Sequence, residues 1–120
     1  MPDDATVVVR GEVVVPADAA VAGTANLVVE LEDVSRADAP TQVIGEHRQE
    51  GVEVKAGGVL PYEIIVPPGA VDERRSYSVR AHIDVSRSGT VEVGDLVSTQ
   101  SYPVLTRGHG RQAAIAVKTV

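Results

Sequence analysis

Apolar and polar residues alternate in several short runs, and this alternation constrains the fold more than any other feature of the sequence. From Tyr77 to Val85 the odd positions hold Tyr, Val, Ala, Ile and Val, while the even positions hold Ser, Arg, His and Asp. Successive side chains of a β-strand point to opposite faces. This run is therefore predicted to be a strand with one buried face and one solvent-facing side.

Further runs repeat the pattern in whole or in part. They span residues 6–15, 25–34, 41–49, 60–66, 95–104 and 113–117. The run at 41–49 turns polar after Val43 and Ile44, which is typical of an edge strand. Pro103 has no main-chain N–H, so the run at 95–104 should end near it or lie along an edge. Segments rich in Gly, Pro and Asp separate the runs and predict turns.

About seven short strands separated by turns predict an all-β fold, namely an immunoglobulin-like antiparallel β-sandwich. No window keeps a helical period over three turns, and residues 69–75 allow only a short helical turn. The chain has 120 residues and no visible linker or repeat, so we expect residues 1–120 to form a single domain. Tyr77 fits either a plain core tyrosine or a tyrosine corner, in which its hydroxyl would bond back to residues 72–76.

Composition argues against several function classes. The formal net charge is −6, so the chain lacks the basic surface that binds nucleic acid. Three tyrosines are its only aromatic residues, which leaves little for a stacking platform. The absence of cysteine excludes disulfides, thiolate metal sites and cysteine nucleophiles.

The residues that could carry chemistry are few. His82 and Asp84 lie two apart on one strand face, and His47 from another strand could join them in a surface metal site. His109 lies in the loop Arg107–Arg111, which could wrap an anion or simply connect two strands. No GxSxG elbow or recognised metal motif is present. We therefore predict no enzyme activity, no catalytic, cofactor-binding or metal-binding residues, and no cofactor.

Acidic residues gather at 30–33 and 46–53 and could attract calcium. Their spacing matches no EF-hand pattern, so solvated strand faces are the favoured interpretation.

The N-terminus does not have the layout of a signal peptide. It reads MPDD, and no apolar run in the chain approaches the ~20 residues of a membrane helix. The chain as written is expected in the cytoplasm. If an export signal has been removed from it, the periplasm or outer membrane is expected instead.

Five segments together give the sequence a familiar pattern. They are LEDVSRADAP at 31–40, VI at 43–44, LPYEI at 60–64, YSVRAHI at 77–83 and YPVLTRG at 102–108. With these segments the chain resembles the YbaY/YscW-like family of small bacterial envelope lipoproteins, from about residue 7 to residue 108. It departs from the family pattern because it shows neither an export signal nor a lipid-bearing cysteine.

The resemblance implies a β-sandwich, no enzyme activity and a binding or assembly role. Members related to YscW act as pilotins, which help to assemble a type III secretion secretin, whereas YbaY-like members have no settled function. The motifs also have a local interpretation: Asp33 and Ser35 can cap main-chain amides, Asp38 can set a turn, and Arg80 can pair with a carboxylate of a neighbouring strand.

We expect a protein partner, or a second copy of the chain, to bind through a sheet edge. Segment 41–49 and the strand that ends at Pro103 are the candidate edges. The alternatives are a small transthyretin-like hydrolase that uses surface histidines and a small-molecule carrier.

Overall fold

The computed structural model describes residues 7–20, 23–35, 41–67 and 69–120, and all regular secondary structure in these ranges is β-strand. The strands are β1 (Val7–Val14), β2 (Gly23–Asp33), β3 (Gln42–Val54), β4 (Val59–Val66), β5 (Tyr77–Asp84), β6 (Leu96–Ser98), β7 (Tyr102–Val104) and β8 (Gln112–Thr119). The predicted all-β class is confirmed. The described residues contain no helix of the length and hydrophobicity that crossing a membrane requires.

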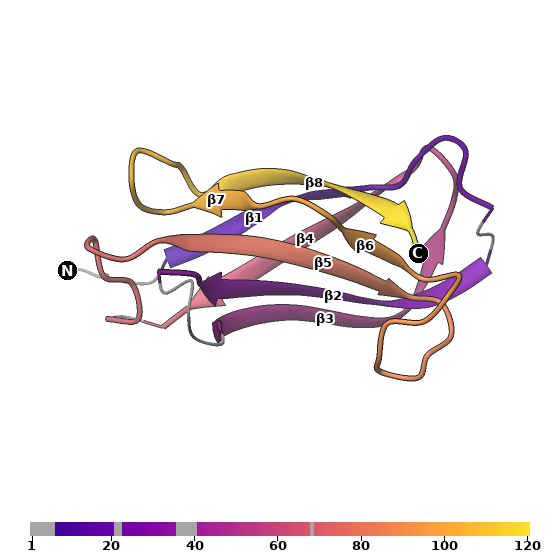
Figure 1. Cartoon of the computed structure of the whole chain (residues 1–120), viewed down its shortest axis with the longest axis horizontal. Coiled ribbons are helices and arrows are strands. Elements are labelled where there is room, and N and C mark those ends of the chain that lie inside the picture. Colours follow the sequence, from indigo (N-terminus) through magenta and orange to yellow (C-terminus); the bar gives the residue numbers. More distant parts are fainter. Residues whose placement is uncertain (1–6, 21–22, 36–40, 68) are drawn as a thin grey trace.

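The eight strands form one continuous sheet rather than two clearly separate layers. Their order is β3-β2-β5-β6-β8-β1-β4, and β7 pairs with β5. The path curls round, so that β4 crosses behind β5 and β2 (Figure 1). The fold is therefore nearly closed and barrel-like, and the expected immunoglobulin-like sandwich is too specific a description of it.

One strand pair contradicts the expected antiparallel arrangement. β1 and β8 pair in parallel, from Arg10 opposite Gln112 to Val14 opposite Ala116. A glycine in β1 permits this close pairing, since a Cβ atom at Gly11 would lie 2.0 Å from the main-chain oxygen of Ala113. The sequence pattern shows which face of a strand is buried but not the direction of its neighbour, so it could not predict this pair.

The prediction of one continuous strand at 95–104 is wrong. The segment forms two short strands, β6 and β7, with an irregular stretch between them. β6 pairs with the end of β5 and with β8, whereas β7 pairs with the start of β5. Serine side chains bond β5 to both sides of this interruption. Ser98 Oγ accepts the N–H of Ala81 at 3.0 Å, and Ser78 Oγ accepts the N–H of Tyr102 at 3.2 Å. Pro103 lies inside β7, opposite Ser78.

Alternate residues of β2, β4 and β5 point into one shared core, to which β1 and β8 add residues, whereas β3 buries only Val52 and Val54. The buried apolar side chains include Val9, Val13, Leu27, Val29, Leu31, Ile64, Val66, Val79, Ile83, Leu96, Val104 and Ile115. Burying such side chains is worth about 1.5–3 kcal/mol each against leaving them exposed. The alternation in the sequence therefore identified the buried face of β1, β2, β4, β5 and β8, but not that of β3, whose core residues Val52 and Val54 lie beyond the predicted run 41–49.

Of the two interpretations left open for Tyr77, the structure shows the tyrosine corner. Its ring is 2 % exposed, and its hydroxyl accepts the N–H of Asp72 at 2.8 Å and donates to the carbonyl of Ala70 at 3.5 Å. The hydroxyl thus fixes the segment that leads into β5. The helical turn considered at 69–75 does not form; a tight turn takes its place, in which Arg75 N–H donates to Asp72 at 2.9 Å.

Candidate protein-binding site

β3 is a long strand at one end of the sheet, and it is bent twice. Its only strand partner among the described residues is β2. The pairing shifts between Ala25 and Leu27 and again between Leu31 and Glu32, and at each shift β3 contributes one extra residue. Such bulges bend a strand and increase its twist. They turn β3 away from the flat sheet and carry it towards β4, the other end of the path.

β3 and β4 come together without forming a main-chain ladder among the described residues. We call this junction the seam, formed by residues 45–47 of β3 and 63–65 of β4. His47 Nδ1 lies 3.4 Å from the N–H nitrogen of Glu63 and 3.3 Å from its carbonyl oxygen. A Cβ atom at Gly45 would lie 2.8 Å from Cγ2 of Ile64. Side chains thus occupy the place of main-chain pairing.

One tautomer of His47 satisfies both ring nitrogens. Nε2 lies 3.3 Å from Oε1 of Gln49, so a proton on Nε2 can be donated to that oxygen. Nδ1 is then unprotonated and accepts the N–H of Glu63. In this tautomer the imidazole covers one main-chain donor of the exposed edge of β4.

The outer surface beside the seam is a shallow groove of about 560 Å³. Its lining residues are Arg10, Gly11, Glu12, His47, Gln49, Pro61, Tyr62, Glu63 and Gln112. Burial raises the pKa of Tyr62 to about 12, and its hydroxyl donates to the carbonyl of Ala113 at 2.8 Å. The two strands that border the groove also expose apolar side chains. These are Val43 of β3, which is 45 % exposed, and Val59 and Ile65 of β4, which are 49 % and 63 % exposed. Both strands at the seam therefore offer apolar side chains to a partner.

The histidines considered for a metal site are not brought together. His82 is in register with Val28 of β2 and, across it, with Arg48 of β3, whereas His47 is in register with Val29. His47 and His82 therefore lie on opposite faces of the sheet. His109 lies apart from both, exposed in the loop between β7 and β8, where its N–H donates to the carbonyl of Thr106 at 3.1 Å.

His82 instead contacts the buried carboxylate of Asp95, which no pattern in the sequence indicated. Its Nε2 lies 3.0 Å from Oδ2 of Asp95, which is fully buried. Asp95 also accepts the N–H groups of Val85, Ser86 and Glu92 at 2.9, 3.1 and 3.0 Å. Burial acts to raise the pKa of Asp95, but the bonds from His82 and the main chain outweigh it and hold the pKa below its ordinary value.

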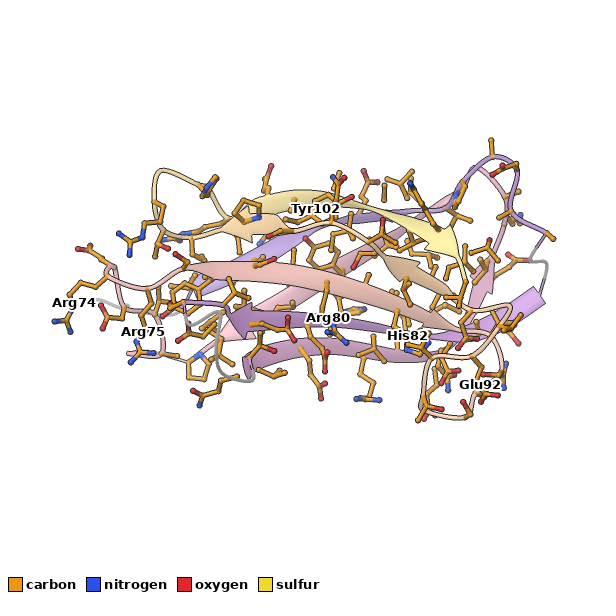
Figure 2. All side chains as sticks on the ribbon, viewed as in Figure 1. Arg74, Arg75, Arg80, His82, Glu92 and Tyr102 are labelled. Carbon is orange, nitrogen blue, oxygen red and sulfur yellow. The ribbon has the colours of Figure 1, made fainter. Side chains whose placement is uncertain are left out.

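Arg80 and Asp33 behave as predicted. Arg80 lies 3.5 Å from Glu30 and 3.7 Å from Glu32 on the outer face of the neighbouring strand β2 (Figure 2). Asp33 Oδ1 accepts the N–H of Ser35 at 3.0 Å, and Ser35 Oγ accepts the N–H of Ser76 at 2.8 Å. The turn predicted at Asp38 lies outside the described residues. These motifs join β2 to β5.

The remaining polar candidates also have local partners. The guanidinium of Arg107 donates to the carbonyl of Arg74, which ties the loop at 107–111 to the segment before β5. In the acidic cluster at 46–53, Glu46 pairs with Arg48 at 3.3 Å and Glu53 lies 3.9 Å from Lys55. These contacts agree with the interpretation of the acidic cluster as a solvated strand face.

Comparison with known proteins decides which family this fold represents. Residues 4–117 match the family described as type III secretion system lipoprotein chaperone (YscW). The chain belongs to the YscW family. The resemblance found in the five sequence segments is confirmed, and membership of a chaperone family supports a protein-binding or assembly role without enzyme activity. No curated protein matches the sequence.

A solved structure shares the fold of this YscW-family chain. It is described as the structure of an alternative pilotin from the type II secretion system of Vibrio cholerae. The TM-score is 0.76 at 24 % sequence identity, and the match covers 96 % of this chain and 97 % of the pilotin. At that identity the likeness concerns the fold, and it extends over nearly the whole of both chains.

Proposed function

We propose that this YscW-family chain is a non-enzymatic assembly chaperone that binds an extended segment of a secretin subunit as an added strand along β3. Family membership supports the class of function. An exposed sheet edge supports the mode of binding, because unpaired N–H and C=O groups accept a further strand.

The observation that carries the proposal is the bonding at the seam. The main chain of β4 at Glu63 is bonded across the seam by one side chain, His47, and not by a strand. A partner strand can replace this imidazole with main-chain groups and leave the pairing of β3 with β2 intact. The exposed Val43, Val59 and Ile65 would then be covered by apolar side chains of the partner.

The two alternatives receive no support from the comparisons. Neither the family match nor the structural match concerns a transthyretin-like hydrolase or a small-molecule carrier. The histidines that such a hydrolase would use lie on opposite faces of the sheet or in a separate loop.

The proposal can be tested with overlapping peptides that span the secretin of the same organism and with a proline scan of residues 43–49. A proline whose lost N–H faces β2 should lower the melting temperature, because it removes a ladder bond. A proline whose lost N–H faces the seam should leave the fold intact and weaken peptide binding at least tenfold. Peptide affinity and circular dichroism of each variant are the measurements.

His47→Ala provides the matched control. It removes the side chain that occupies the seam and keeps every main-chain group of β3, so peptide binding should be retained or strengthened. Equal peptide affinity in all folded proline variants would contradict strand addition. Concentration-dependent dimerisation without peptide binding would show that the edge serves self-association instead.

A further inference from the structure

The free edge of β3 has a regular segment in its middle. Residues 45–49 pair with β2 without a shift, from Gly45 opposite Leu31 to Gln49 opposite Leu27, and a bulge lies on either side. In Figure 1, β3 runs along the lower rim of the molecule. This segment is therefore the part of the edge that a further strand can follow in regular register.

The hydrogen bonds between β2 and β5 show which main-chain groups of this segment are free. Val34 N–H donates to the carbonyl of Ser76 at 2.9 Å and continues the register of the β2–β5 ladder, so the even-numbered residues of β2 bond to β5. Directions alternate along a strand, so the odd-numbered residues of β2 bond to β3. His47 lies opposite an odd-numbered residue and bonds to β2. The N–H and C=O groups of Glu46 and Arg48 therefore point to the free edge.

The other side of β5 gives the same assignment independently. Ala81 is opposite Val29 of β2, yet its N–H donates to Ser98 Oγ of β6, away from β2, at 3.0 Å. Ala81 and Val29 therefore form a non-hydrogen-bonded pair, and Val29 bonds to His47 on its other side. Both observations leave the same two residues of β3 facing outward.

These two residues also carry opposite charges on the outer face of the sheet. The side chains of Glu46 and Arg48 contact each other at 3.3 Å and are exposed by 43 % and 59 %. On β2, the residue opposite Glu46 is Glu30, which has the same charge. Like charges directly opposite each other destabilise a strand pair. A basic side chain on the open side of Glu46 would therefore be favourable.

Two copies of this edge can pair with each other in antiparallel orientation around a two-fold axis. Hydrogen-bonded residues of such a ladder face each other, so each outward residue must lie opposite an outward residue of the second copy. Within residues 45–49 this leaves three registers. Two of them place Glu46 opposite Glu46 or Arg48 opposite Arg48, with like charges together. The third centres the axis on His47 and places each Glu46 opposite the Arg48 of the other copy.

We propose that the free chain forms a symmetric dimer through residues 45–49 of β3, in which Glu46 of each copy pairs with Arg48 of the other. The same patch serves both copies, which is the condition for a two-fold interface. The ladder keeps β3 paired with β2. The imidazole of His47 must turn aside from the seam, and its bonds to Glu63 are long, at 3.3–3.4 Å.

The bulges limit the strength of this dimer. Only two hydrogen-bonded residue pairs fit within the regular segment, because the register of β3 shifts on both sides of it. Association must also offset the loss of translational and rotational freedom. We therefore expect a dissociation constant on the order of 10⁻⁴ M.

The dimer has a consequence for the proposed strand addition. A second copy and a secretin segment use the same edge of β3, so they compete for it. Binding of the segment should therefore dissociate the dimer. Only this competition rests on the proposed function, whereas the dimer follows from the register and charges of β3 alone.

Sedimentation velocity of the 120-residue chain without peptide, from about 10 µM to about 1 mM, tests the dimer. The weight-average sedimentation coefficient should rise with concentration towards that of a dimer. Glu46→Arg and Arg48→Glu each place like charges opposite one another and should weaken association at least tenfold. The double variant Glu46→Arg/Arg48→Glu restores opposite charges and should associate within about threefold of the original chain. Glu92→Arg, an equal charge change on the exposed β5–β6 loop, is the matched control and should associate normally.

The substituted side chains are exposed, so the variants should fold, which circular dichroism checks. A chain that stays monomeric up to about 1 mM, or a double variant as weak as the single ones, would overturn the dimer. Adding the secretin peptide separates the two proposals. Peptide binding to a chain that is always monomeric would contradict the dimer alone. Dimerisation without peptide binding would contradict the proposed function alone.

Discussion

The β2–β5 pair and the β3–β4 seam show two ways of satisfying the main chain of a strand. β2 and β5 pair without interruption from Asn26 opposite Asp84 to Asp33 opposite Tyr77. At the seam, β3 is bulged twice and meets β4 through the imidazole of His47. A continuous ladder can be broken only by unfolding, whereas a side chain can rotate away. This difference is the reason why we propose that a partner strand enters at the seam.

The largest effect should come from the buried end of the β2–β5 region. Asp95→Ala removes the acceptor of three main-chain N–H groups and the partner of His82. Leaving such buried groups unpaired should lower the free energy of unfolding by about 3–5 kcal/mol. Urea denaturation measures this loss. Asp18→Ala, at an exposed position, is the control and should change stability by less than about 0.5 kcal/mol.

Lowering the pH should cause part of the same loss in the free energy of unfolding. The pKa values of Asp33, Asp84 and Asp95 are all held below the ordinary value of 3.8, in Asp84 and Asp95 because hydrogen bonds outweigh burial. A carboxyl whose pKa is lower in the folded state stabilises the fold above its unfolded pKa, and that contribution disappears as the pH falls through the folded value.

We therefore expect the contribution of these three groups to be constant above about pH 5 and to decline below about pH 4. Urea denaturation at a series of pH values measures it. Asp95→Asn should flatten the decline if the variant folds. A stability that rises on acidification from pH 5 to pH 3 would contradict the assignment of these carboxylates.

Adding a methyl group at each of two glycines should destabilise the hydrogen-bonded part of the sheet more than the seam. Gly11→Ala places Cβ 2.0 Å from a main-chain oxygen of β8, so the β1–β8 pair must move apart at a cost of about 2–3 kcal/mol. Gly45→Ala meets one methyl group of Ile64 across the seam, and we expect about 1 kcal/mol. Thermal denaturation compares the two. Gly110→Ala, with no atom within 4 Å, is the neutral control.

The smallest effects compare one hydrogen-bonding side chain from each region. Tyr77→Phe removes the corner hydroxyl and leaves the N–H of Asp72 unpaired, which should cost about 1–1.5 kcal/mol. His47→Ala removes longer, exposed bonds of 3.3–3.4 Å and should cost less than about 0.5 kcal/mol. Equal costs in urea denaturation would mean that the seam is as firmly held as the corner.

The sequence allowed the strands to be located, because alternation shows directly which side chains are buried, as at Val79 and Ile83. It also allowed prediction of local capping by Asp33 and Ser35, and it offered the contact of Tyr77 with the preceding segment as one of two alternatives. The parallel pairing of β1 with β8 and the break between β6 and β7 depend on neighbours distant in the sequence, and alternation is unchanged by either.

The candidate protein-binding site was likewise only partly predictable from the sequence. Segment 41–49 was expected at an edge from its polar second half, and the structure places it there. The part of β4 in the seam was missed, since closure of the sheet is not visible in one strand.

Hydrogen–deuterium exchange of the chain, with and without the secretin peptide that we propose as its partner, tests the central claim most directly. The account predicts that amides of residues 43–49 exchange faster than those of the β2–β5 pair in the free protein and slow down when peptide is bound, while the β2–β5 pair is unchanged. Slow exchange of 43–49 in the free protein, or peptide protection confined to other strands, would contradict it.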